Sequence, residues 1–107
     1  MKVVTAFVHR GRVSDIVHAL EAAGFRYLTV IDVKGLLNAI SAVEEYYSIE
    51  LGEKVTDEVK LELICEDDKA EHAVDLIRQH GRTGQAIAGL VYVTPVESYQ
   101  LIDGATP

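Results

Sequence analysis

Apolar residues recur along the chain with two different periods, and these periods predict which segments form strands and which form helices. Short apolar or alternating runs rich in β-branched residues predict four strands, at residues 3–8, 27–33, 59–65 and 90–93. Apolar residues three and four positions apart predict two helices, at residues 14–23 and 68–80. The order βαββαβ predicts an α+β fold of the ferredoxin-like, split βαβ type, with both helices on one face of the sheet.

The helix boundaries are predicted from capping residues. Ser14 is expected to cap the start of the first helix, and Gly24 to supply a left-handed stop at its end. The second helix is expected to begin with a capping box formed by Asp68 and Glu71 and to end at Gly81.

A long segment, residues 35–58, separates the second and third predicted strands and exceeds ordinary hairpin lengths. It is both apolar and acidic, with helix-like spacing, so two interpretations remain equally open. The segment either packs on a partner or a neighbouring subunit, or is a helical insertion that covers a sheet edge. Its candidate partner-binding residues are Glu44, Glu45, Tyr46, Tyr47 and Leu51.

Size and composition narrow the class of protein. With 107 residues, 49% of them hydrophobic, the chain is expected to form one domain, residues 1–107, with its own core. The single Cys65 fits a reducing compartment. No stretch has the pattern of a signal peptide or the length of a membrane span, so we expect a soluble cytoplasmic protein without direct membrane insertion. The net charge of −7 argues against nucleic-acid binding.

Three glycines, Gly81, Gly84 and Gly89, surround Arg82 just before the fourth predicted strand. A glycine-rich turn of this kind can bind phosphate through its backbone N–H groups. No Lys or Arg follows Arg82, however, so the sequence predicts the backbone of a phosphate loop without its usual charges.

Catalytic and metal-binding patterns are weak. None of the four histidines forms an i, i+4 pair, and no general base is placed beside Cys65. We therefore predict no catalytic residues, no enzymatic activity, no intrachain metal site and no permanent cofactor.

The sequence resembles the PII signal-transduction family, and the matching motifs are collinear over almost the whole chain. The motifs that carry the resemblance are Gly24, Thr29-Val30, Val33-Lys34-Gly35, Val59-Lys60-Leu61-Glu62, Asp67-Asp68, Thr83-Gly84, Gly89 and Tyr92-Val93. In this alignment residues 35–58 correspond to the family's T-loop, and residues 82–90 to its B-loop.

The resemblance implies a homotrimer that binds nucleotides in clefts between neighbours and contacts a transporter or a metabolic enzyme through the T-loop. The ligand-binding residues that it implies are Thr29, Lys34, Gly35, Glu62, Ile64, Arg82, Thr83, Gly84, Gln85 and Gly89. Lys34, Lys60 and Arg82 are the cations expected nearest the ligand. The family theme is nitrogen regulation, and control of inorganic-carbon transport is equally open.

The departures from the family pattern concern mainly its cations. Gln85 and Leu90 replace B-loop lysines, Leu101 and Asp103 replace C-terminal arginines, and Leu51 replaces the modified tyrosine. Each lost charge-assisted hydrogen bond removes about 1.5–3 kcal/mol from triphosphate binding. The resemblance therefore predicts a smaller or less charged effector, such as an adenine nucleotide or a small anion. The alternatives are a metal-binding trimer resembling copper-tolerance proteins and linked to heavy-metal efflux, and a scaffold that binds protein only.

Overall fold

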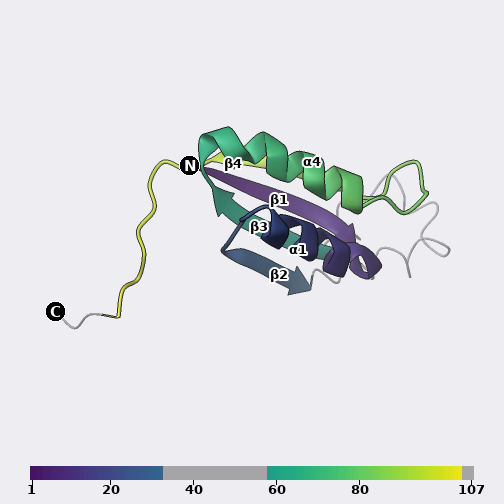
Figure 1. The fold of residues 1–107 in the computed structure, drawn as a ribbon, viewed down its shortest axis with the longest axis horizontal. Helices are drawn as coiled ribbons and strands as arrows, with labels where there is room; N and C mark the ends of the chain where they lie inside the picture. Colours follow the sequence, from purple (N-terminus) through teal and green to yellow (C-terminus); the bar gives the residue numbers. More distant parts are fainter. Residues whose placement is uncertain (33–57, 105–107) are drawn as a thin grey trace, which may run out of the picture.

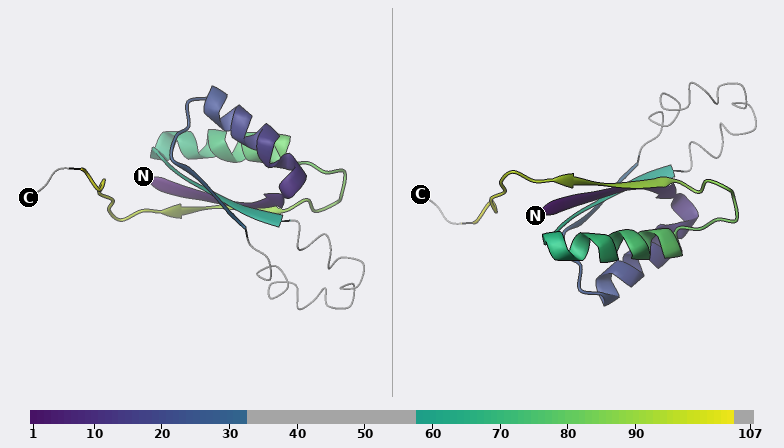
Figure 2. Two further views of the ribbon diagram at one scale, coloured as in Figure 1. Left: turned by 90° about the horizontal axis from the view of Figure 1, so that it is seen from below. Right: turned by 90° about the horizontal axis from the view of Figure 1, so that it is seen from above.

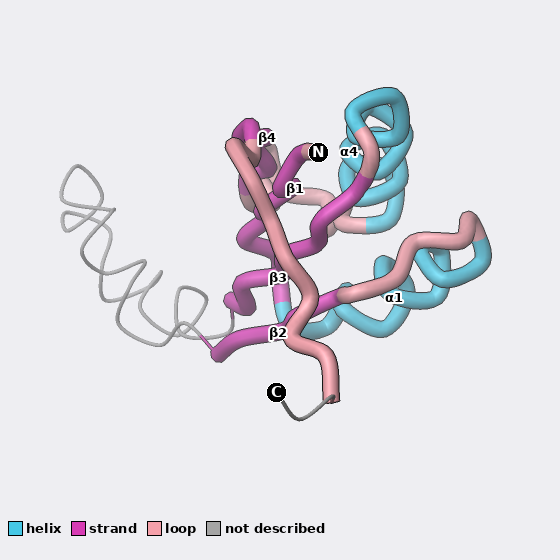
Figure 3. Tube along the Cα trace, turned by 90° about the vertical axis from the view of Figure 1, so that its left-hand side faces the viewer, coloured by secondary structure: helices cyan, strands magenta, loops and turns pink. Residues whose placement is uncertain are grey.

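The computed structural model describes residues 1–32 and 58–104. Four strands form one antiparallel sheet in the order β2-β3-β1-β4, with two helices on one of its faces (Figures 1 and 3). The strands are β1 (Lys2–His9), β2 (Leu28–Asp32), β3 (Glu58–Cys65) and β4 (Leu90–Pro95), and the helices are α1 (Val13–Ala22) and α4 (Ala70–His80). The prediction of a ferredoxin-like α+β fold is confirmed.

The strand register fixes which residues face the helices. β3 alternates between buried and partly exposed positions along its whole length, as its sequence predicts. Its buried side chains, Leu61 and Leu63 among them, meet Ile16 and Leu20 of α1 in the core. Complete burial of one such side chain contributes about 1.5–3 kcal/mol, so this shared core holds the helices against the sheet.

Among residues 1–32 and 58–104, no helix lies on the opposite face of the sheet (Figure 2). Register partners in neighbouring strands point to the same side, so Ile31, Leu90 and Tyr92 share this open face with Lys60 and Glu62. The three apolar side chains are between 43 and 45% exposed. In the described part of the chain, one face of the sheet is therefore covered by helices and the other is open.

Both predictions for the helix starts are wrong, because each helix is preceded by a short 3-10 helix. Before α1, the Nδ1 atom of His9 accepts a hydrogen bond of 3.0 Å from the backbone N–H of Gly11, and Ser14 lies inside the helix. Before α4, the N–H of Lys69 donates to the Glu66 carbonyl over 3.0 Å. Asp68 lies within this 3-10 helix, so the capping box with Glu71 does not form. The 3-10 hydrogen bonds satisfy amides that a cap would otherwise bind.

The predicted helix ends are confirmed. Gly24 follows α1 with φ of 89°, the left-handed stop expected there, and the Phe25 N–H donates to the Leu20 carbonyl over 3.0 Å. Gly81 ends α4 with its N–H donating to the Ile77 carbonyl over 2.8 Å. It does so with φ of −90°, without entering the left-handed region.

Two segments border the sheet. Asp32, the last residue of β2, is the register partner of Val59 in β3, so the chain leaves and re-enters the sheet on adjacent strands. The intervening residues 33–57 lie outside the described part of the chain.

After β4, residues 96–104 run away from the sheet (Figure 1), with Leu101 and Ile102 exposed. Among the described residues, no helix is long and apolar enough to cross a bilayer.

Candidate functional site

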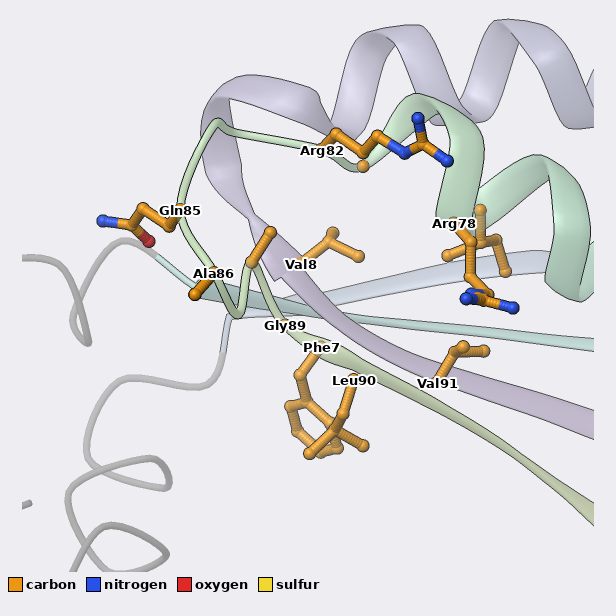
Figure 4. Close-up of a pocket in the computed structure, with 12 residues that line it drawn as sticks. Phe7, Val8, Arg78, Arg82, Gln85, Ala86, Gly89, Leu90 and Val91 are labelled. Atoms are coloured by element: carbon orange, nitrogen blue, oxygen red, sulfur yellow. The ribbon is translucent and has the colours of Figure 1, made fainter.

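The glycine-rich loop lies where α4 ends and β4 begins, beside the end of β1, and it borders a pocket (Figure 4). This pocket has a volume of about 520 Å³. Its apolar lining residues are Phe7 and Val8 of β1, Ile77 of α4, and Leu90 and Val91 of β4. The side chains of Phe7 and Leu90 point to the open face of the sheet, away from the two helices. The polar side chains of the pocket are Arg78, Arg82 and Gln85. The size is within the range of small-molecule sites, about 300–1,000 Å³.

The loop backbone depends on glycine at two positions. Gly84 has φ of 88°, which side chains with a Cβ rarely adopt, and the neighbouring Thr83 Oγ1 accepts a hydrogen bond from the Gln85 N–H over 3.4 Å. Gly89 has φ of 155°, and a Cβ there would collide with the backbone carbonyl oxygen of Phe7. The loop can therefore approach the end of β1 closely only because residue 89 is glycine.

The charge of the pocket is positive. Arg78 is in the last turn of α4, and Arg82 lies four residues further along the chain, after the helix has ended. Within residues 1–32 and 58–104, neither guanidinium has an ion-pair partner, and no described residue that lines the pocket is acidic. Two cations therefore border a pocket with a mixed polar and apolar lining in a chain whose net charge is −7.

Arg78 lines the pocket but is not among the predicted ligand residues, whereas Lys60, one of the three cations expected nearest the ligand, does not line it. Lys60 lies on β3, two strands away from Leu90, because β1 separates β3 from β4. Its Nζ atom is 3.5 Å from Oε2 of Glu62, and it does not line the pocket. The sequence feature that could have pointed to Arg78 is its spacing of four residues from Arg82, which places both residues near the same end of α4.

The structure sorts the predicted ligand residues into two groups. Arg82, Gln85 and Gly89 border the pocket, and Thr83 and Gly84 belong to the same loop. The second group lies on the open sheet face: Thr29 and Glu62 are register partners in β2 and β3, and Ile64 follows two residues along β3. None of these three lines the pocket. Lys34 and Gly35 lie outside the described residues, as do Glu44, Glu45, Tyr46, Tyr47 and Leu51.

Cys65 and the histidines were the other candidates for chemistry, and the structure shows what surrounds them. Cys65 is 7% exposed, and burial raises the pKa of its thiol, which disfavours the nucleophilic thiolate. The ring of His72 lies 6.0 Å from that of Phe25, centroid to centroid, at a tilted angle. Among the described residues, no three His, Cys, Asp or Glu side chains gather as metal ligands.

The fold and this pocket define a small ferredoxin-like protein with an anion-compatible site at one end of its sheet. Comparison with protein families matches residues 1–105 to the family described as nitrogen regulatory protein P-II. A relative from Methanothermobacter thermautotrophicus, nitrogen regulatory protein P-II 1, is 31% identical over 90% of this chain and 84% of its own length. The nitrogen regulatory protein P-II of Azospirillum brasilense is also 31% identical, over 91% of this chain and 87% of its own.

The match covers almost the whole chain, so the protein belongs to the P-II family of signalling proteins. Members of this family are regulators rather than enzymes.

Proposed function

We propose that this protein assembles as a trimer and senses a small anionic effector in clefts between neighbouring copies. The observation that carries the proposal is the division of the expected ligand residues into two groups within one chain. One group is on the glycine-rich loop, and the other is on the open face of β2 and β3. A cleft between copies allows the loop of one copy to meet the sheet residues of the next.

The open sheet face supports assembly. Ile31, Leu90 and Tyr92 present apolar surface that neither α1 nor α4 covers. Burial of apolar surface is the main favourable term in protein association, so packing this face against other copies stabilises an oligomer. Three copies arranged head to tail around an axis close into a ring in which every cleft is equivalent.

The effector is expected to carry fewer charges than a triphosphate. Gln85 and Leu90 border the pocket at the positions where the family pattern has lysines, and neither contributes a charge. Residues 35–58, which connect β2 to β3, are proposed to carry the signal to a transporter or a metabolic enzyme. The names of the relatives favour nitrogen metabolism, and inorganic-carbon metabolism remains the alternative.

Analytical ultracentrifugation and calorimetry test the assembly and its ligand. We expect a trimer at micromolar concentration and binding heat with at least one of ATP, ADP, AMP, cyclic AMP or bicarbonate. A monomer at that concentration would contradict the proposal, because a single chain does not join the two groups of residues.

A mixing experiment tests whether the cleft is shared. Thr29→Ala removes a hydroxyl group from the sheet group and Arg82→Gln removes a cation from the loop group, so each variant alone should bind the effector weakly. When the two variants are unfolded together and refolded as mixed trimers, about one quarter of the clefts combine two intact groups. Recovery of that fraction of high-affinity sites supports a shared cleft. If mixing recovers no sites, the effector is bound within single chains.

A further inference from the structure

The C-terminal segment, residues 96–104, exposes large apolar side chains that its own chain leaves uncovered. Leu101 is 73% exposed and Ile102 is fully exposed, although side chains of both types are stabilised by burial. The segment starts beside Met1, whose carbonyl accepts a hydrogen bond of 3.1 Å from the Val96 N–H, and it then runs away from the sheet (Figures 1 and 2). An extended arm of this kind indicates a binding surface on another molecule.

The free edge of β4 provides a matching surface. β4 is at one end of the strand order, so its outer backbone groups have no strand partner among the described residues. Val93 faces the helices, because its register partner Val4 is a core residue, yet it is 41% exposed. On the open face of the same strand, Tyr92 is 45% exposed. The edge therefore presents apolar side chains on both of its faces.

One cation lies beside this edge. Arg78, in the last turn of α4, places its guanidinium group between α4 and β4, near Val91 (Figure 4). Within residues 1–32 and 58–104 it has no ion-pair partner, and no described residue that lines the adjoining pocket is acidic. The C-terminal segment contains two acids, Glu97 and Asp103, and no cation. The charge of the segment is therefore complementary to the charge beside the edge.

We propose that residues 99–103 of one copy lie as an added strand along the free edge of β4 in a neighbouring copy. Side chains alternate along an extended strand, so Leu101 and Asp103 point to one face and Ile102 to the other. With the first two on the helix side, the leucine packs on the exposed valine of β4 and the aspartate lies beside Arg78. Ile102 then packs on the exposed tyrosine of the open face. This inference rests on the proposed assembly and names one contact within it.

The position of the segment favours a neighbouring copy over the same chain. The hydrogen bond of Val96 keeps the segment in line with β4 where it leaves the sheet, so its own strand edge lies behind it. The contact joins two different surfaces, the segment of one copy and the strand edge of the next, and is therefore heterologous. Heterologous contacts repeated around an axis close into a ring, which is the symmetry of the proposed trimer.

Disulfide cross-linking tests the contact directly. In a Cys65→Ala background, Leu101→Cys is mixed with Val91→Cys or Val93→Cys, and each mixture is unfolded, refolded and oxidised. Mass spectrometry should find covalent dimers between the two variants, because a disulfide forms only where Cα atoms lie within about 7 Å. Glu21→Cys in place of the valine variants is the control, since Glu21 is exposed on α1 and not on β4.

The cross-linking result has two outcomes that overturn the proposal. One is that neither valine position gives a mixed dimer. The other is that chains carrying both substitutions form only intrachain bridges, because the segment then folds back on its own strand.

Charge reversal provides the second test. Arg78→Glu and Asp103→Lys should each lower the association constant of the trimer about 10-fold, because each replaces an attraction by a repulsion. The double variant should regain most of the loss. Analytical ultracentrifugation over a range of concentrations measures the association, and thermal unfolding shows that each variant remains folded. Gln79→Glu is the matched control, because it adds a negative charge to the same helix turn. A double variant that associates no better than the single variants refutes the ion pair and the proposed contact.

The outcomes separate this inference from the proposed function. A trimer that binds its effector but shows neither cross-links nor an effect of charge reversal overturns the C-terminal contact and leaves the proposed function standing. Cross-links between copies of a protein that binds none of the tested effectors support the contact and contradict the proposed function.

Discussion

Replacement of Gly89 by alanine tests how closely the loop approaches β1. A Cβ at this position would overlap the Phe7 carbonyl oxygen, which belongs to the backbone of a central strand and cannot rotate away. The backbone at Gly89 also has φ of 155°, a conformation that costs a non-glycine residue about 1–3 kcal/mol. Relief of the overlap requires a backbone shift, which adds about 1–3 kcal/mol. We therefore expect Gly89→Ala to lower the free energy of unfolding by at least about 2 kcal/mol.

Urea denaturation followed by circular dichroism measures this change, at one fixed protein concentration because assembly affects apparent stability. Two controls separate the causes. Gly84→Ala has the unfavourable φ of 88° but no atom within 4 Å of the added Cβ, so it should cost about 1–2 kcal/mol. Gly104→Ala has neither problem and should stay within about 0.5 kcal/mol of the original protein. Equal stability of Gly89→Ala and Gly104→Ala would show that the close approach to Phe7 is wrong.

Three further predictions concern the body of the protein. Leu61→Ala removes a side chain with no exposed surface and should cost about 3–5 kcal/mol in urea denaturation, and a loss below 1 kcal/mol would contradict its place in the core. Cys65 should react slowly with iodoacetamide in the native state and faster as the pH rises above 9, because burial raises the pKa of its thiol. If the native and the urea-unfolded protein react equally fast at pH 8, Cys65 is not buried. The ammonium group of Met1 lies 2.6 Å from Asp67 Oδ1, and this contact lowers the pKa of the Asp67 carboxyl below 3.8. The ion pair therefore contributes to stability above pH 4, and this contribution is lost as the pH falls through the folded-state pKa of Asp67. The difference in melting temperature between the protein and Asp67→Asn should accordingly shrink on acidification, and a constant difference from pH 7 to pH 2 would exclude the ion pair as its cause.

The sequence predicted the fold well where a pattern follows directly from burial. The alternation along β3 could be recognised because every second side chain enters the core and the others face away from it. The stop at Gly24 was predictable for a similar reason, since a left-handed residue is energetically acceptable mainly as glycine.

The helix starts were not predictable by the same means. Ser14 and Asp68 have the side chains of good caps, but backbone hydrogen bonds in the preceding 3-10 helices satisfy amides locally. The choice between a side-chain cap and a backbone turn depends on how the chain leaves the preceding strand, which is a property of tertiary structure rather than of residue type.

The candidate site was predicted in part. The loop glycines and Arg82 could be identified from their order along the chain, whereas Arg78 has the pattern of an ordinary cation at a helix end. Its relation to the pocket depends on how α4 packs beside β4, which the local sequence does not specify. Lys60 was named from its place in the family pattern, and its side chain pairs with Glu62 on another part of the sheet.

The pairing of Asp32 with Val59 has a consequence for how this protein can change over evolution. Asp32 and Val59 lie opposite each other on adjacent strands, so the sheet itself brings together the two ends of the connection between β2 and β3. Doubling the length of such a connection costs only about 0.6 kcal/mol in chain entropy. The length of this connection can therefore change over evolution at little cost in chain entropy, because the pairing of β2 with β3 brings its two ends together.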